Sequence, residues 1–194
     1  MYPIMERVAR IMAILGGLVL TALIIMTCAS VLGRGLNTLG HSGFLTGLAP
    51  GLASWLTQSG IGPVQGDFEL VEAGIAFCVF AFLPLCQLHR GHATVDIFTN
   101  ALPAPVNAFI TTFWEILLTL TILLISWRLF VGMLDKQNYA ETTFILQFPV
   151  WWAYAVSFLA ALVASVVAVY CAFAHVQALR QGKSFEPSEQ GAVH

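Results

Sequence analysis

Four long apolar runs alternate with more polar segments along the chain, and each run is long enough to cross a membrane. A helix needs about 20 apolar residues to span the ~30 Å hydrocarbon core of a bilayer. The runs cover residues 8–32, 68–88, 106–134 and 149–174. They predict an all-α membrane protein in which four transmembrane helices form a single domain over residues 1–180. We expect residues 181–194 to form a disordered cytoplasmic tail.

Two of the connecting segments show the periodicity of short amphipathic helices. Residues 33–67 are rich in glycine, yet they contain apolar residues at helical spacing: Leu48, Leu52, Trp55 and Leu56. This spacing predicts a short helix on the outer membrane surface, and a flexible glycine-rich loop is the alternative. Residues 91–102 place Asp96, Thr99 and Asn100 on one helical face and Val95, Phe98 and Leu102 on another. We expect a second interfacial helix there.

The distribution of Lys and Arg predicts the orientation, because basic residues near helix ends are retained in the cytoplasm. One side of the membrane would hold Arg7, Arg10, Arg90, Arg180 and Lys183, and the other side only Arg34 and Lys136. Both termini and the 89–105 loop are therefore predicted to be cytoplasmic.

Several ionisable residues lie within or beside the apolar runs, where an unpaired charge is costly. Arg34, Glu69, Glu72 and Arg128 fall at similar depths near the outer ends of the first three runs. They could form a ring of interhelical ion pairs, or each could extend separately to the outer interface.

Glu115 lies deeper, about nine residues into the third run. It is too far along the helix to reach Arg128, so its partner must come from another helix or another chain. It could instead be protonated, since burial disfavours the charged form of a carboxyl group. A proton relay would need further carboxylates at successive depths, and the apolar runs show no second one at mid-membrane.

Small residues recur at helical spacing in two of the runs. The fourth run contains two such rows, which include Ala161 and Ala164, and the first run contains Ala9, Ala13, Gly17 and Thr21. Small residues allow close helix packing in lipid. We expect these faces, together with Glu115, to contact helices of a second protein.

Composition narrows the functional classes. Of the 194 residues, 58% are hydrophobic and 9% are charged, and the mean hydropathy is +0.83. The eight basic residues are scattered, which argues against nucleic acid as a partner. No arrangement of residues indicates a catalytic site, so we do not expect an enzyme. His89 and His175 end the second and fourth runs, which leaves a haem-binding, cytochrome b-like membrane subunit as an alternative.

A family resemblance appears in and after the second run. That run opens with Phe68-Glu69-Leu70-Val71-Glu72 and passes through Pro84 and Cys86 to the stretch that contains Arg90, His92, Val95 and Asp96, followed by Leu102-Pro103. Together with Arg34 and Phe148-Pro149, these residues resemble the DctQ family, the small membrane subunit of tripartite ATP-independent periplasmic (TRAP) transporters. The resemblance covers about residues 8–175. The long glycine-rich segment and Ala93, where a β-branched residue is common, depart from the family pattern.

The resemblance implies a transport function in a bacterial inner membrane. In such systems a periplasmic substrate-binding protein delivers an organic acid to a large, DctM-like permease subunit, which takes it up by sodium-coupled symport. The small subunit would bind the permease as a scaffold, with Na+ bound by the permease and no cofactor in this chain. A free-standing small exporter is a further alternative.

Overall fold

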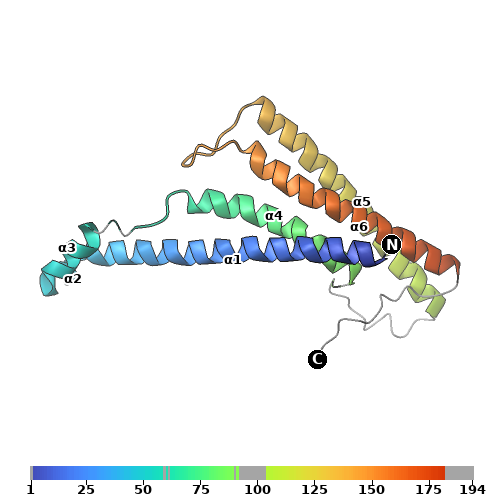
Figure 1. Ribbon diagram of the computed structural model, residues 1–194, viewed down its shortest axis with the longest axis horizontal. Coiled ribbons are helices and arrows are strands. Elements are labelled where there is room, and N and C mark those ends of the chain that lie inside the picture. The colour runs from blue at the N-terminus through green and yellow to red at the C-terminus, as the bar shows by residue number, and fades with distance from the viewer. Residues whose placement is uncertain (1, 59, 61, 90, 92–103, 182–194) are drawn as a thin grey trace.

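The computed structural model describes the chain except for residues 1, 59, 61, 90, 92–103 and 182–194. Four long helices dominate it: α1 (Tyr2–Gly40), α4 (Asp67–Leu88), α5 (Ala104–Asn138) and α6 (Trp151–Arg180). Two short helices, α2 (Gly43–Leu48) and α3 (Pro50–Gln58), follow α1 (Figure 1). The described residues form no strand beyond a single bridge between Thr142 and Pro149. The predicted all-α fold is confirmed.

All four long helices are long and apolar enough to cross a membrane. Each predicted run lies almost wholly within one of them. The largest difference is at the end of the first run, because α1 continues past residue 32 to Gly40. Two contacts accompany this extension: Gly33 packs against the backbone of Gly62, and Gly40 packs against Leu56 and Thr57. Helix propensity alone would disfavour glycine at both positions.

α1 and α4 pack as an antiparallel pair with a regular register. Four contact layers are spaced seven residues apart on both helices: Ala9 with Leu88, Gly16 with Ala81, Leu23 with Gly74, and Ser30 with Asp67. Seven-residue spacing keeps one face of each helix against its partner along the whole contact. We call the two ends of this pair the Asp67 end and the Leu88 end.

The long helices are arranged in a row and do not enclose a central space. α1 packs mainly against α4, α4 against α6, and α6 against α5. In the view of Figure 1 the α1–α4 and α5–α6 pairs converge toward the Leu88 end and diverge toward the Asp67 end. Near the Leu88 end, Ala9, Leu88, Val167 and Cys171 form a buried cluster that joins α1, α4 and α6.

α6 is the most buried of the four helices, and this corrects the expectation for its small-residue rows. Ala161 is fully buried and Ala164 is 1% exposed, because both lie inside the chain's own helix contacts. In α1, by contrast, the predicted row is not the packed face beyond Ala9. Space beside Gly17 is open and Thr21 is exposed, because contact with α4 follows seven-residue spacing through Ala9 and Gly16. The prediction that the small-residue rows are free for a second protein is therefore wrong for α6, whereas Gly17 and Thr21 of the α1 row lie outside the contacts of this chain.

The predicted short helix in the glycine-rich segment is present as α3. Its Ala53 and Leu56 are buried, and Leu56 packs against Gly40 of α1. Trp55 and Leu48 are 64% and 75% exposed. Leu48 ends α2, so the predicted apolar face is divided between two helices. The helix predicted for residues 91–102 lies outside the described residues apart from Gly91.

Candidate interaction sites

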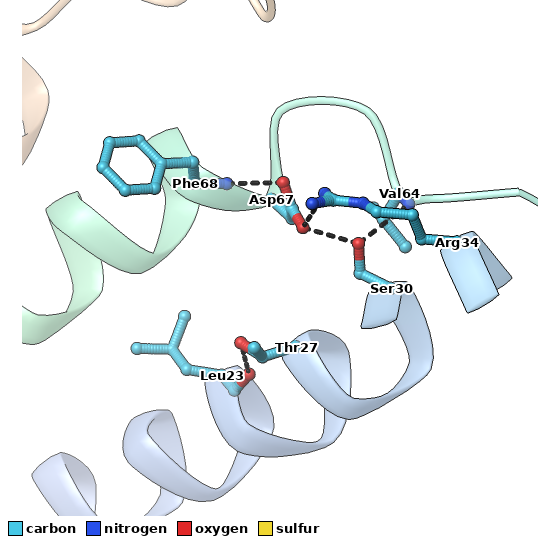
Figure 2. A network of polar contacts seen from close by, with 7 residues as sticks. All are labelled: Leu23, Thr27, Ser30, Arg34, Val64, Asp67 and Phe68. Atoms are coloured by element: carbon cyan, nitrogen blue, oxygen red, sulfur yellow. Dashed lines mark hydrogen bonds and ion pairs between the residues drawn. The ribbon is translucent and has the colours of Figure 1, made fainter. Parts of the chain in front are cut away.

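A polar network joins α1 to the start of α4 at the Asp67 end (Figure 2). Ser30 Oγ donates a hydrogen bond of 2.5 Å to Asp67 Oδ2 and accepts one of 3.2 Å from the Val64 backbone N–H. The other carboxylate oxygen of Asp67 accepts from the Phe68 N–H at 2.8 Å. Ser30 is fully buried, so its hydroxyl depends on these partners. The network holds the loop before α4 and the helix itself against α1.

Arg34 joins this network at its exposed edge. Its Nη2 lies 3.7 Å from Asp67 Oδ2, and 63% of the Arg34 side chain is exposed. The prediction that Arg34 pairs with Glu69 or Glu72 in a charge ring is therefore wrong. Its partner is Asp67, which the sequence analysis did not single out. An ion pair this exposed contributes little to stability.

Two other members of the predicted ring do not pair with Arg34. Glu72 and Arg128 are exposed, and neither forms an ion pair with another residue that the structure describes. Arg128 lies two residues beyond Ser126, which faces α6, so it lies on the opposite side of α5. The four charges do not form one ring.

Glu69 instead binds the backbone of the connection between α5 and α6. Its two carboxylate oxygens accept hydrogen bonds from the Ile145 N–H at 2.6 Å and the Leu146 N–H at 2.9 Å. The Leu146 side chain packs against Gly66, which has a φ of 76° and has no room for a Cβ. The carboxylate therefore ties the start of α4 to a segment about 76 positions further along the chain.

The 139–150 connection is itself internally hydrogen-bonded. Thr143 N–H donates to the Phe148 carbonyl at 2.9 Å, and Val150 N–H donates to the Glu141 carbonyl at 3.0 Å. Lys136 at the end of α5 pairs with Glu141 at 2.6 Å. At its tip, Phe144 is 92% exposed. The connection is thus a defined hairpin that links the two helix pairs where they diverge.

Glu115 has a partner on another helix of the same chain, which corrects the expectation that it contacts a second protein. Gln87 Nε2 donates a hydrogen bond of 2.5 Å to Glu115 Oε1, and Gln87 is 3% exposed. Gln87 lies in the last turn of α4, so Glu115 is level with the Leu88 end of the α1–α4 pair. α5 begins about 16 Å earlier, at Ala104, at a rise of 1.5 Å per residue. Glu115 is therefore far from mid-membrane depth relative to α4.

Hydroxyl groups join α5 to α6. Thr119 Oγ1 lies 3.2 Å from the Ala168 carbonyl oxygen, and Ser126 Oγ lies 3.3 Å from that of Ala161. Ser126 also shares a hydrogen bond of 2.8 Å with Ser165. Because the alanines opposite are small, the helix backbones approach closely enough for a short hydroxyl to reach the neighbouring carbonyl.

The histidines and the inner loop complete the set of candidates. His175 is 4% exposed and its Nδ1 lies 2.9 Å from the Cys171 carbonyl of its own helix, while His89 is exposed at the end of α4. The two rings occupy different environments, which does not favour a matched pair of haem ligands. Arg90, His92 and Asp96 lie outside the described residues.

Sequence reasoning missed Ser30, Asp67 and Gln87, although each left a signal. Ser30 and Asp67 continue the seven-residue spacing of Ala9, Gly16 and Leu23 on α1 and of the matching positions on α4. Gln87 is a polar residue in the last turn of an apolar run, where a buried partner is required. These groups connect helices to one another, and the described part of the chain brings together no group of three or more metal-ligating side chains.

Comparison with known proteins agrees with this architecture. The family model described as tripartite ATP-independent periplasmic transporters, DctQ component, matches residues 23–178, which is most of the chain. No curated protein and no solved structure matches the chain. The matched region contains the second half of α1, all of α4 and α5 and nearly all of α6, together with the Ser30–Asp67 and Gln87–Glu115 contacts. The chain is therefore a multi-pass membrane protein that belongs to the DctQ family of TRAP transporter components.

Proposed function

We propose that this protein is the small scaffold subunit of a sodium-coupled TRAP-type secondary transporter. It binds a large permease subunit in the bacterial inner membrane, and a periplasmic binding protein delivers an organic acid to that permease. Na+ and the substrate bind to the permease, and this chain holds no cofactor. The family match is the basis of this proposal.

The continuity of the long helices is the observation that supports a scaffold role. Substrate and ion sites of secondary transporters typically lie where membrane helices are interrupted. Here α1, α4, α5 and α6 are each continuous, and α4 remains so even though it contains Pro84. The helices pack in a row, α1–α4–α6–α5, which provides two outer faces for a partner and no ring of helices around a path.

We further propose that both termini are cytoplasmic and that the Asp67 end faces the periplasm. The excess of Lys and Arg near the Leu88 end supports this orientation. To test it, single cysteines replace Ser42, Asn138 or Ser188 in a variant without the four native cysteines. An impermeant thiol reagent should label intact cells at positions 42 and 138 only. Labelling of position 188 from outside would reverse the orientation.

Reconstitution tests the scaffold role directly. Liposomes that contain this chain and its permease should take up the organic acid when a sodium gradient and the binding protein are present. Liposomes with either subunit alone should show strongly reduced uptake. Uptake by this chain alone would contradict the proposal and favour a free-standing exporter, whereas a haem absorption band in the purified chain would favour the cytochrome-like alternative.

A further inference from the structure

α5 has two chemically different faces along most of its length. The face toward α6 carries Thr112, Thr119 and Ser126, which are buried and spaced seven residues apart. Residues two positions further along lie about 200° around the helix, at 100° per residue. They include Thr121 and Arg128, which are exposed, and exposed leucines flank them: Leu117 and Leu124. The second face is therefore directed away from the rest of the chain.

Arg128 places a permanent positive charge on this exposed face, well within the span of the helices. It lies 13 residues beyond Glu115, or about 20 Å at the helical rise, and Glu115 is level with the last turn of α4. From that turn, the Asp67 end lies about 30 Å away along α4. Arg128 is thus about two-thirds of the way along that distance, and no residue that the structure describes forms an ion pair with it.

A guanidinium at this depth either extends toward the outer interface or takes an anionic or strongly polar partner from outside the chain. Lipid phosphates lie at the membrane surface, which would be nearer the end of α5. There, Asp135 is exposed on the same face, seven residues beyond Arg128, and its carboxylate would repel a phosphate. An acidic side chain on a neighbouring membrane helix could approach Arg128 at its own depth.

We propose that the Leu117–Thr121–Leu124–Arg128 face of α5 contacts a membrane helix of the large permease, and that an acidic side chain of that helix neutralises Arg128. This inference rests on the proposed function and adds the contact face and its charge. The buried small residues of α6, including Ala161 and Ala164, hold α5 in position from the other side.

Photo-crosslinking in the co-expressed complex tests the contact face. The amino acid p-benzoylphenylalanine replaces Leu117 or Leu124, and Val166 on the exposed face of α6 provides the matched control. Irradiation should join positions 117 and 124 to the permease, with much less product from position 166. Equal yield at 166, adducts with lipid only, or adducts with a second copy of this chain would overturn the inference. If the permease still co-purifies with this chain in those cases, the proposed function stands and only the assigned contact face is wrong.

Charge variants test the role of Arg128. Arg128→Leu should lower the recovery of permease per chain by about fivefold or more in solubilised complex, which corresponds to about 1 kcal/mol. Arg128→Lys should restore most of it, and the same loss should not follow Arg34→Leu, since Arg34 pairs within its own chain. The purified subunit alone should show no loss of thermal stability with Arg128→Leu. Unchanged recovery with Arg128→Leu would contradict the pairing. A loss of recovery that depends only on whether anionic phosphatidylglycerol is present would contradict it as well.

Discussion

The α1–α4 and α5–α6 pairs are both antiparallel, yet they achieve close contact in different ways. In α1–α4, small residues of one helix oppose larger residues of the other, as Leu23 opposes Gly74. Its oxygen-to-oxygen contact, Ser30 with Asp67, lies at one end, and the middle of the pair has a thiol contact of 3.3 Å from Cys78 Sγ to the Gly16 carbonyl. In α5–α6, hydroxyl groups such as Thr119 and Ser126 reach backbone carbonyls along the middle of the contact.

The difference shows two solutions to one problem. Lipid provides no hydrophobic drive between helices, so association depends on close packing and on interhelical hydrogen bonds. Close packing of the α1–α4 kind is sensitive to any added volume. Hydrogen bonding of the α5–α6 kind tolerates loss better, because Ser165 retains its bond to the Ala161 carbonyl of its own helix. The variants below separate these two kinds of contact.

Adding volume at the α1–α4 contact should have the largest effect. A Cβ at Gly16 would lie 2.9 Å from Ala81 Cβ, which cannot move independently of its backbone. Gly16→Leu should therefore force the helices apart and lower the free energy of unfolding by about 3 kcal/mol or more. Thermal unfolding of the purified protein in detergent measures this loss. Gly17→Leu is the matched control, because the space beside Gly17 is open; equal losses would mean that the register is wrong.

Removing the polar contact at the Asp67 end should have an intermediate effect. Ser30→Ala deletes a buried hydroxyl, so the Val64 N–H and the Asp67 carboxylate each lose a hydrogen-bond partner. We expect the free energy of unfolding to fall by about 1–3 kcal/mol. The control is Thr27→Ala, because the exposed Thr27 hydroxyl bonds only to Leu23 of its own helix (Figure 2). A double-mutant cycle should show coupling between Ser30 and Asp67 and additivity between Arg34 and Glu72.

Removing one hydroxyl from the α5–α6 contact should have a smaller effect. Ser126→Ala should cost about 0.6 kcal/mol, a typical value for interhelical hydrogen bonds in membranes. Thr121→Ala, on the exposed side of the same helix, should be close to neutral in the purified subunit, since its hydroxyl bonds to Leu117 of α5. If Ser126→Ala were as damaging as Gly16→Leu, the distinction between the two pairs would not hold.

Loss of the Glu69 contact should loosen the 139–150 hairpin locally, with little change in overall stability. Glu69→Gln removes the charge that accepts the Ile145 and Leu146 N–H groups, so hydrogen exchange at these two amides should become about tenfold faster. Mass spectrometry of exchanged peptides can follow it. Glu72→Gln provides the control, and similar exchange in both variants would show that Glu69 does not hold the hairpin.

The helices were more predictable than their contacts. The length of the apolar runs predicted all four spans, and helical spacing around Trp55 predicted α3. The extension of α1 through Gly33 and Gly40 was not predictable, because it depends on loop and helix contacts formed by residues far along the chain. The same is true of Glu115, whose partner Gln87 lies 28 positions away.

The amino-acid sequence by itself determined that four helices would form and which family the chain resembles. Both follow from local properties, namely the length of each apolar run and a set of short motifs. Only the tertiary structure decided which face of each helix is buried and which charges pair. Those outcomes depend on the register between helices, and a shift of one turn, about 5.4 Å, would exchange Asp67 for a different partner of Ser30.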